Sequence, residues 1–323
     1  MTSRPRFPVI DSHVDLIYDL VRHHPDKPLE DLPDAWCCLP RLAAGNVKII
    51  VSAFYCQDGC NGPMTAAENL RSLLRYSDNY LKALPVVRTR QELEACFEGA
   101  GNPGTLLLLE NADPLLEFDP AILKRLGFGI VGLTHAGRNR IGCGNKVENP
   151  AGLSEAGRSL VTRLDRLGFA LDLAHLSEPC FRETVDIFTG PLVSTHTGIR
   201  AFCDTPRNLS DRQIRTILDR DGMIGLAAYP GMLSPAGEAC IDDFFRQLDW
   251  FIRRYGPWGI GIGSDFGGFD TMCRGVEDHS ALPRVADLLA GAGHSDQVIA
   301  AVFGENWLRF FSRLLTAAPA ENH

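Results

Sequence analysis

Short apolar segments alternate with longer amphipathic segments along this chain. Eight apolar, β-rich segments of strand length occur near residues 8–12, 47–54, 105–109, 129–134, 169–174, 191–195, 223–228 and 259–264. Between most of them, apolar residues recur at three- and four-residue spacing, which is typical of helices that bury one face. These helical stretches cover residues 65–83, 154–167, 209–220, 241–255 and 295–315. Strands that alternate with helices form a parallel sheet, and eight such units predict a closed (β/α)8 barrel of the TIM type.

The length of the chain favours one domain. The chain has 323 residues, of which 45% are hydrophobic, enough to build one large barrel with a sizeable core. We find no linker, low-complexity segment or repeat, so residues 1–323 are interpreted as a single domain. Two polar segments, 55–64 and 136–152, do not fit a minimal barrel. Each follows a predicted strand, so both are expected to lie over the active-site face as binding loops.

The charge and the apolar runs exclude several functions. The net charge is −8, with Lys and Arg dispersed, which argues against nucleic-acid binding. No apolar run approaches the roughly 20 residues of a membrane span, and the first residues lack the apolar core of a secretory signal. We therefore expect a cytoplasmic protein that does not bind membranes. The ten cysteines are a small fraction of a long chain without a signal, so they are expected to be reduced thiols. A structural zinc at Cys56 and Cys60 is not expected, because they have no second pair at zinc-site spacing.

Residues that can bind metal or move protons stand at the ends of five apolar segments. They are His13 and Asp15, Glu110, His175, His196, and Asp265. In a parallel barrel these ends meet at one face, where active sites lie. The pattern therefore predicts one site with the chemistry of a two-metal hydrolase.

Each of these residues also has a simpler interpretation. His13 and Asp15 are two apart, so both point the same way in a strand and can reach one cation, although an isolated His-X-Asp is usually a chance match. Glu110 follows four leucines and needs a partner, which could be Arg or Lys, or two metal ions with one carboxylate oxygen on each. A lone strand-end histidine is more often structural than a ligand. His175 and His196, however, lie on adjacent strands and could share a cation.

The donor set suits zinc. Neutral imidazoles together with carboxylates are typical zinc ligands, and five ligands for two ions leave positions for solvent. A hydroxide made available near neutral pH would be the nucleophile. Asp265 could be a sixth ligand, a general base and acid, or simply an aspartate that caps a loop through Ser264.

The order of these motifs along the chain resembles the membrane (renal) dipeptidase family, peptidase family M19, a branch of the amidohydrolase-like metal hydrolases. The matching pieces cover almost the whole chain. They are Asp-Ser-His-Val-Asp at 11–15, Glu-Asn at 110–111, Leu-Thr-His-Ala-Gly-Arg-Asn at 133–139, Asp-Leu-Ala-His-Leu-Ser at 172–177, Ser-Thr-His-Thr at 194–197, Arg-Asn-Leu-Ser-Asp at 207–211, Gly-Ile-Gly-Ser-Asp-Phe at 261–266 and Gly-Glu-Asn-Trp-Leu-Arg at 304–309.

The resemblance implies a role for each residue. His13 and Asp15 would bind one zinc ion, His175 and His196 the other, and Glu110 would bridge them; other divalent metals are compatible with these ligands. Asp265 would be the proton shuttle, and His135 would polarise the scissile carbonyl and stabilise the oxyanion. Arg207 would bind the substrate's terminal carboxylate, a role that suits a guanidinium fork. Its alternative is a surface ion pair, since Arg-Asn-Leu-Ser-Asp at 207–211 also resembles the start of a helix, and Asn208 is expected to support the backbone there.

The sequence departs from the family in two places. Gly267 stands where many relatives have Asp, and the helix before the eighth strand lacks a histidine pair. Neither change removes an expected ligand, but both leave the substrate preference open. The signal peptide and lipid anchor of the animal enzymes have no counterpart here. His23, His24, His279, His294 and His323 match no motif and are expected to be surface or helix residues.

The sequence therefore predicts a zinc-dependent dipeptidase with two Zn²⁺ ions per chain, compatible with a C-terminal D-residue in the substrate. The substrate would be a dipeptide or a similar small carboxylate-bearing amide. One alternative is another reaction on the same metals, such as opening a cyclic amide or lactone, against which Arg207 argues. Another is a non-catalytic binding or maturation protein of a biosynthetic cluster, against which the intact ligand set argues. The oligomeric state stays open, a homodimer being one option.

Overall fold

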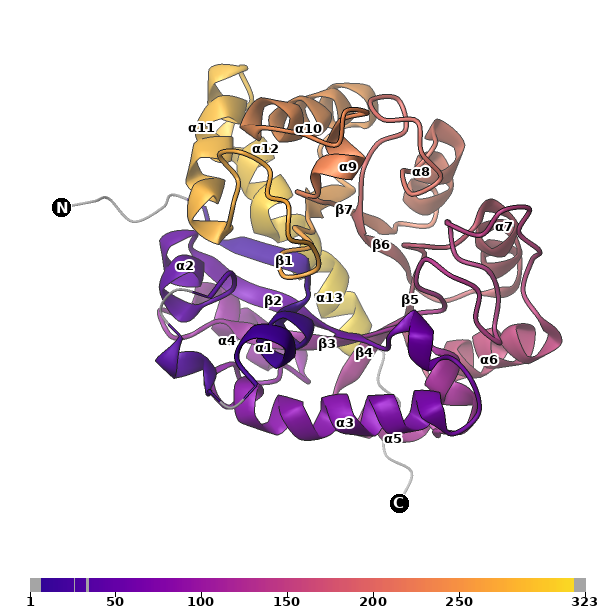
Figure 1. Ribbon diagram of the computed structural model, residues 1–323. Coiled ribbons are helices and arrows are strands. Elements are labelled where there is room, and N and C mark those ends of the chain that lie inside the picture. The colour runs from indigo at the N-terminus through magenta and orange to yellow at the C-terminus, as the bar shows by residue number, and fades with distance from the viewer. Residues whose placement is uncertain (1–6, 26, 33–34, 317–323) are drawn as a thin grey trace.

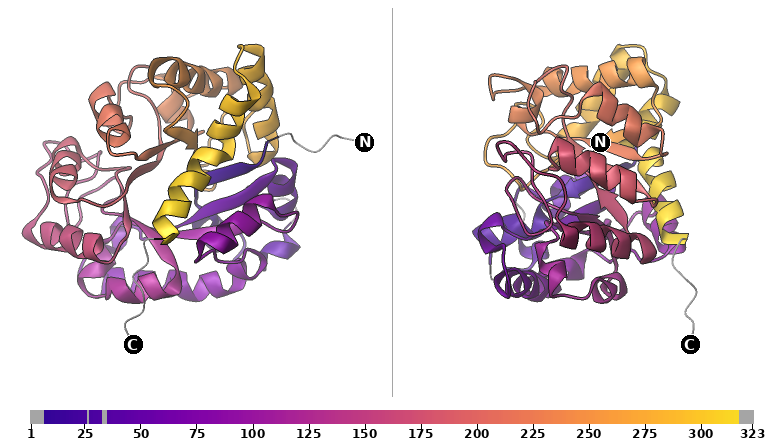
Figure 2. Two further views of the ribbon diagram at one scale, coloured as in Figure 1. Left: turned by 180° about the vertical axis from the view of Figure 1, so that it is seen from behind. Right: turned by 90° about the vertical axis from the view of Figure 1, so that its right-hand side faces the viewer.

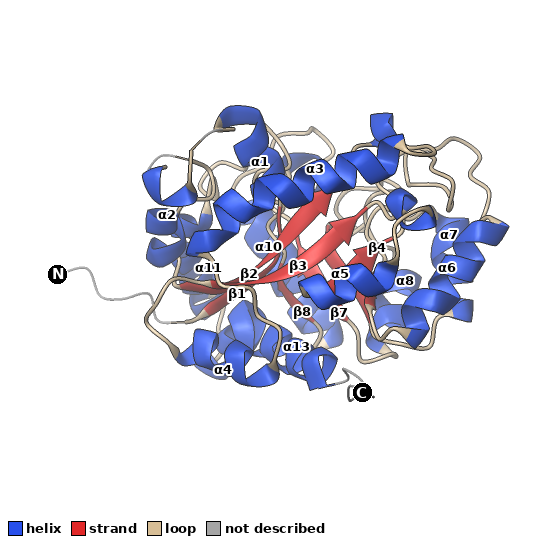
Figure 3. Ribbon diagram, turned by 90° about the horizontal axis from the view of Figure 1, so that it is seen from below, coloured by secondary structure: helices blue, strands red, loops and turns tan. Residues whose placement is uncertain are grey.

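The structure is a computed structural model that describes residues 7–25, 27–32 and 35–316. Its eight strands are parallel and close into a barrel in sequence order, which confirms the predicted (β/α)8 fold. Helices surround the strands on all sides (Figures 1 and 3). The strands are β1 (Val9–Val14), β2 (Val47–Tyr55), β3 (Gly104–Glu110), β4 (Phe128–Gly132), β5 (Ala170–Asp172), β6 (Leu192–Thr197), β7 (Met223–Leu226) and β8 (Ile260–Ile262).

The barrel closes between its first and last strands, where Asp11 pairs with Ile262.

β5 and β8 are shorter than the apolar segments that predict them. A left-handed backbone follows soon after each strand, with φ of 63° at His175 and 65° at Asp265. Left-handed residues leave the extended conformation, so apolar residues beyond these strands belong to the loops that carry the site.

Four of the five predicted helical stretches are single α-helices or end in a short 3-10 turn. In one of them, Ser154 is the N-cap and accepts a hydrogen bond from the backbone N–H of Gly157. The fifth stretch is divided into α12 (Asp296–Ala300), a π-helical turn (Ala301–Glu305) and α13 (Asn306–Thr316). The other predicted helices are α3 (Thr65–Tyr80), α6 (Glu155–Arg166), α8 (Asp211–Leu218) and α10 (Ile241–Tyr255), and those not predicted are α1 (Leu16–His23), α2 (Leu39–Ala44), α4 (Arg90–Glu98), α5 (Pro120–Leu126), α7 (Glu178–Ile187), α9 (Pro230–Leu233) and α11 (Leu282–Gly291).

The core has two parts. The larger part lies between the strands and the surrounding helices. The smaller part fills the barrel with strand residues such as Ile49, Leu106 and Met223, and it includes Trp307 and Phe311 of α13. Helix α13 crosses the back of the barrel (Figure 2), and Trp307 donates a hydrogen bond to the carbonyl of Ile262. This helix closes the barrel on the side opposite the strand ends that carry the predicted ligands.

The described helices include none that is long and apolar enough to span a bilayer. The ten cysteines all lie among the described residues and form no disulfide bonds with one another. Among the described residues, the groups of side chains close enough to share a metal ion all lie at the barrel site, and none contains Cys56 or Cys60.

Candidate metal centre

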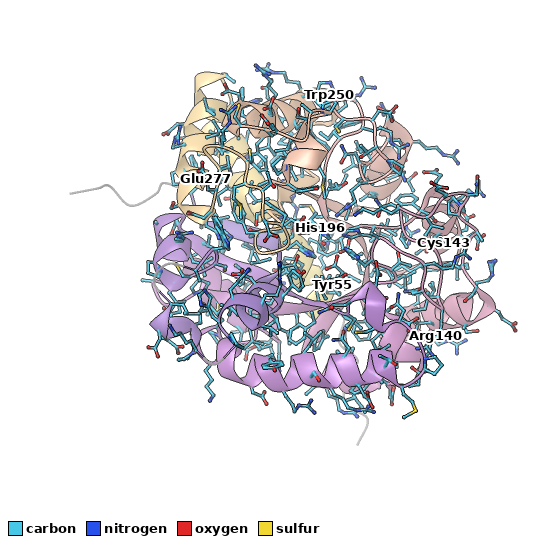
Figure 4. All side chains as sticks on the ribbon, viewed as in Figure 1. Tyr55, Arg140, Cys143, His196, Trp250 and Glu277 are labelled. Carbon is cyan, nitrogen blue, oxygen red and sulfur yellow. The ribbon has the colours of Figure 1, made fainter. Side chains whose placement is uncertain are left out.

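The six strand-end residues converge at one end of the barrel. His13 Nε2 lies 3.8 Å from Asp15 Oδ2, 3.8 Å from Glu110 Oε2 and 4.0 Å from Asp265 Oδ1. On the other side of Glu110, His175 Nε2 lies 2.9 Å from His196 Nε2. His196 lies near the middle of the barrel, with Tyr55 beside the same opening, whereas Arg140 and Trp250 lie toward the periphery (Figure 4). Residues scattered from 13 to 265 therefore form one cluster.

Glu110 stands between two groups of ligands. Its Oε1 lies 3.1 Å from His175 Nε2 and 3.7 Å from His196 Nε2, while its Oε2 faces His13. Among the described residues, the ion pairs of this carboxylate are with histidines and not with Arg or Lys. Each carboxylate oxygen thus faces a different pair of candidate ligands, the arrangement that a bridging carboxylate requires.

Several buried polar atoms of the cluster fit a bound cation. His13 Nε2, Asp15 Oδ1 and His175 Nδ1 are buried and have no hydrogen-bond partner. A buried polar atom without a partner costs free energy, so such atoms call for a ligand. Nitrogen and carboxylate oxygen donors match zinc and similar divalent ions. The residues present therefore fit the metal centre that the sequence predicts.

The electrostatics of the cluster also suit a cation. Burial disfavours the charged forms of His175 and His196, and Arg207 acts in the same direction, so their pKa values fall well below normal and both are neutral. Burial alone would raise the pKa of Glu110, but His175 and His13 outweigh it and keep it ionised. Burial opposes a charge on His13 too, yet Asp15, Glu110 and Asp265 raise its pKa to about 10. The neutral imidazoles of His175 and His196 beside the ionised Glu110 are in the protonation states that bind metal, whereas a cation that binds His13 must displace a proton from its ring.

Asp265 is set up to hold a proton. Its backbone N–H donates to the carbonyl of His13 at 3.0 Å, which fixes it at the closure between β1 and β8. Burial raises its pKa well above the normal range, and the neighbouring charge of Asp15 adds to this. A carboxyl group with a raised pKa can both accept and return a proton near neutral pH.

His135 lies beside the cluster and is held by Asp58. His135 Nδ1 is 2.9 Å from Asp58 Oδ2, which also accepts a 2.9 Å bond from the backbone N–H of Gly137. The ring centre of His135 is 4.4 Å from that of His175. Its donor atoms are also close enough to Glu110 and His175 to share a cation with them. The two polar loops, 55–64 and 136–152, thus meet over the site, as the sequence predicts.

Arg207 is not on the surface. Its side chain lines the cavity at the barrel mouth, and its Nη2 donates to the carbonyl of His196 at 2.8 Å. Its Nε and Nη1 are buried without partners. Asn208 supports the backbone as expected, donating to the carbonyls of Cys203 and Met232 at 2.8 Å. A buried guanidinium with free donors beside a cavity is suited to bind an anion.

The cavity holds about 850 Å³ and contains both the polar cluster and an apolar wall. Asp15, Glu110, His175 and Asp265 line it on one side, whereas apolar contacts come from side chains of the surrounding helices and loops, namely Tyr18, Val147, Tyr229, Met232 and Phe269. This volume is within the range of small-molecule sites and exceeds what two small amino-acid residues fill.

The glycines after Asp265 explain one departure from the family. Gly267 has a φ of 89°, where a Cβ would meet the carbonyl oxygen of Asp15 at 2.9 Å. In this chain a side chain at position 267 would therefore be strained. At Gly268 a Cβ would lie 2.3 Å from Asp15 Oδ2 and 2.7 Å from Asp265 Oδ1.

Gly268→Ala should therefore disable the site without unfolding the protein. The added methyl group must push Asp15 or Asp265 away, and displacing catalytic groups by about 1 Å can cost on the order of 10²-fold in rate. We expect reduced turnover with an unchanged circular dichroism spectrum. Gly101→Ala is the matched control, since a Cβ there meets no atom within 4 Å. Equal activity of Gly268→Ala and the control would contradict the described packing.

Several polar residues behind the cluster escaped the sequence analysis. Asp58 supports His135, and Asp172 and Thr195 lie beneath His13 and His196. Asp58 lies in a polar loop, and the other two lie within apolar segments. For Asp172 and Thr195, the only signal was a charged or hydroxyl side chain within a few residues of a predicted ligand, whereas Asp58 is far from all of them in the sequence.

His279 requires a correction. It was expected at the surface or on an ordinary helix, but it is fully buried in a 3-10 turn, with its Nε2 2.8 Å from Asp11 Oδ2. The same carboxylate accepts a 2.5 Å bond from Ser264 Oγ. Asp11 lies two residues before His13, and Ser264 directly before Asp265. This network therefore links the two segments that carry His13 and Asp265. His323 lies outside the described residues.

A (β/α)8 barrel whose strand ends gather buried histidines and carboxylates has the arrangement of a metal-dependent enzyme. The model of the family described as membrane dipeptidase, peptidase family M19, matches residues 4–322. The chain belongs to this family of metallopeptidases, hydrolases that act on peptide bonds.

Individual relatives agree with this assignment. An uncharacterised protein of Klebsiella pneumoniae, from the pqqA 5′ region, is 33% identical over 181 residues, which are 53% of this chain and 66% of that protein. The crystal structure of dipeptidase AC, an M19 metallopeptidase, has a TM-score of 0.81 and 27% identity, and the match covers 96% of this chain and 99% of that one. A metallopeptidase from Rhodobacter sphaeroides, solved with a phosphinate mimic of the dipeptide L-Ala-D-Ala, has a TM-score of 0.84 and 25% identity, over 97% of this chain and 99% of that one. The chain spans less than two thirds of the curated relatives that it first matches, from 39% to 66% of their length.

Proposed function

We propose that this protein is a zinc-dependent dipeptidase with two ions per chain. The observation that carries the proposal is the position of Glu110, with one oxygen toward His175 and His196 and the other toward His13. His13 and Asp15 would hold one ion and His175 and His196 the other. When bound, the two ions would polarise the scissile carbonyl and lower the pKa of a water enough for attack near neutral pH.

The remaining residues bind the substrate and move the proton. Asp265 would take the proton from the attacking water and deliver it to the leaving amine, a task that suits its raised pKa. His135, which Asp58 orients, would face the scissile carbonyl oxygen and stabilise the charge that develops on it. Arg207 would bind the substrate's terminal carboxylate through the donors that have no partner in the protein.

The substrate class follows from the cavity and the relatives. A free carboxylate on the substrate matches Arg207, and the apolar wall can accommodate a side chain. The Rhodobacter sphaeroides relative binds a mimic of a dipeptide with a D-residue in the second position. We therefore propose L,D-dipeptides as well as L,L-dipeptides as substrates.

A substrate screen tests the proposed function. Protein stripped of metal and reconstituted with Zn²⁺ would be assayed against L,L- and L,D-dipeptides, cyclic amides and lactones, with the stripped protein as control. We expect metal-dependent hydrolysis of dipeptides to exceed that of the cyclic compounds. Preferred opening of a ring would identify a different amidohydrolase reaction, and metal-loaded protein with no turnover of any compound would favour a binding role.

Arg207→Ala should impair dipeptides that carry a free carboxylate. Removing a charge-assisted partner costs roughly 1.5–3 kcal/mol, so kcat/KM should fall by roughly 10- to 100-fold. Activity on an amidated dipeptide, already poor, should barely change. Arg207→Lys, which keeps the charge but not the fork, should lie between the wild type and Arg207→Ala. Equal losses on the free and amidated dipeptides would show that Arg207 is structural.

A further inference from the structure

One hydroxyl group connects the two halves of the candidate metal centre. Thr195 is fully buried on β6, directly before His196. Its Oγ1 lies 3.0 Å from His13 Nδ1 and 3.0 Å from His196 Nδ1. These histidines come from different strands and are assigned to different ions in the proposed function. The Thr195 side chain therefore contacts one ligand of each ion.

The single proton of this hydroxyl has a defined acceptor. Thr195 Oγ1 lies 2.5 Å from Asp172 Oδ2 and donates to it. Asp172 itself is fixed, because its Oδ1 accepts 3.0 Å bonds from the backbone N–H groups of Ala174 and Thr195. The carboxylate cannot rotate away without breaking both of these bonds, so it orients the hydroxyl.

The direction of the hydrogen bond from Thr195 to Asp172 determines the tautomers of His13 and His196. A hydroxyl has one donor and two acceptor lone pairs. With its proton directed to Asp172, Thr195 Oγ1 can only accept from His13 and His196, so both rings must carry their proton on Nδ1. Once each ring is neutral, as metal binding requires, the other nitrogen, Nε2, presents a lone pair. The Nε2 atoms of both rings face Glu110, at 3.8 Å and 3.7 Å.

The position of the Thr195 hydroxyl excludes a cation between the side chains of His13, Asp172 and His196. His13, Asp172 and His196 have donor atoms within 4.8 Å of one another, a spacing that would allow them to share an ion. However, Thr195 Oγ1 lies within hydrogen-bond distance of all three. The hydroxyl therefore occupies the place of a cation, and the group acts as a support for the neighbouring site.

We infer that Thr195, oriented by Asp172, is a positioning residue that fixes the Nδ1–H tautomer of both His13 and His196 and thereby prepares both metal positions at once. The inference rests on the proposed function only in that it takes these histidines as ligands of two different ions. It does not depend on which substrate is cleaved.

Two substitutions that change the size of the Thr195 side chain only slightly distinguish the effect of its hydroxyl group from the effect of its packing. Thr195→Val keeps the branched shape and removes the hydroxyl, whereas Thr195→Ser keeps the hydroxyl and removes a methyl group. Zn²⁺ affinity would be measured by competition with a chromophoric chelator, and metal content by mass spectrometry after dialysis. Loss of a group that supports a ligand typically weakens metal binding by about 10- to 100-fold. We expect Thr195→Val to weaken both binding steps by that factor and Thr195→Ser to stay within about threefold of the wild type.

Two results of this experiment would overturn the inference. Wild-type affinity in Thr195→Val would show that the hydroxyl is not needed, and weakening of only one binding step would show that it is not shared. Circular dichroism and thermal melting of the metal-free variants would show whether they are folded.

A measurement on the unmodified protein remains decisive if Thr195→Val fails to fold. Nitrogen-15 NMR of the Zn²⁺-loaded wild type, with histidine side chains labelled, reports which ring nitrogen carries the proton. We expect Nδ1–H for both His13 and His196, and an unprotonated Nδ1 on either ring would overturn the inference. Protein that binds two ions but cleaves no dipeptide would refute the proposed function and leave this inference standing.

Discussion

Glu110→Gln should lose metal and activity together. The substitution preserves the size of the side chain but replaces one carboxylate oxygen with an amide nitrogen, which does not bind cations. One of the two sides of Glu110, toward His13 or toward His175 and His196, would therefore lose its ligand. The remaining buried charges would be poorly compensated, which is the most damaging type of change in a buried polar network. Metal analysis should give fewer than two ions per chain, and dipeptide hydrolysis should fall to background.

Glu94→Gln is the matched control for this prediction. Glu94 forms an exposed ion pair with Arg90 one helical turn away, so the same chemical change there should leave metal content and turnover unaltered. A Glu110→Gln protein that still holds two tightly bound ions would contradict the bridging role.

Asp265→Asn should separate turnover from metal binding. Asparagine has the size of aspartate and tolerates the left-handed conformation that residue 265 adopts at a φ of 65°. The backbone should therefore keep its shape, while the group that accepts and returns a proton is lost. General acid–base help is typically worth 10²–10⁴ in rate, so kcat should fall by roughly that factor with nearly unchanged metal content.

Asp270→Asn is a useful comparison, because Asp270 lies in the same loop but is exposed and forms an ion pair with Arg22. Its kinetics should match those of the wild type. If Asp265→Asn loses its ions as well as its activity, Asp265 is a ligand and not the proton carrier.

The strand-end positions of the candidate ligands could be predicted from the sequence for a topological reason. Once the apolar segments are assigned to parallel strands, the residues that follow them must meet at one end of the barrel. This rule alone was enough to predict that His13, Glu110 and His196 lie close together. Some of the longer helices, such as α3 and α10, were also predictable, because their apolar residues keep a helical period over several turns.

The rest depended on contacts between segments far apart in the sequence. Thr195 and Asp58 are common polar residues, and only the packing of neighbouring segments reveals that they hold His13, His196 and His135. His279 could not be placed because its partner, Asp11, lies at the opposite end of the sequence. The division of the last predicted helix reflects local packing too, since a Cβ at Gly304 would lie 2.7 Å from the carbonyl oxygen of Pro8.

The closure between β1 and β8 also determines when the metal centre can exist during synthesis. His13 is synthesised well before Asp265, and the segments that carry them pair only after β8 has left the ribosome. The interior is covered later still, when α13 brings Trp307 against the barrel. A nascent chain therefore carries separate ligands but no complete binding site. Binding of both ions must therefore wait until β8 has emerged, and a ribosome stalled before β8 would display a chain that cannot yet retain the pair of ions.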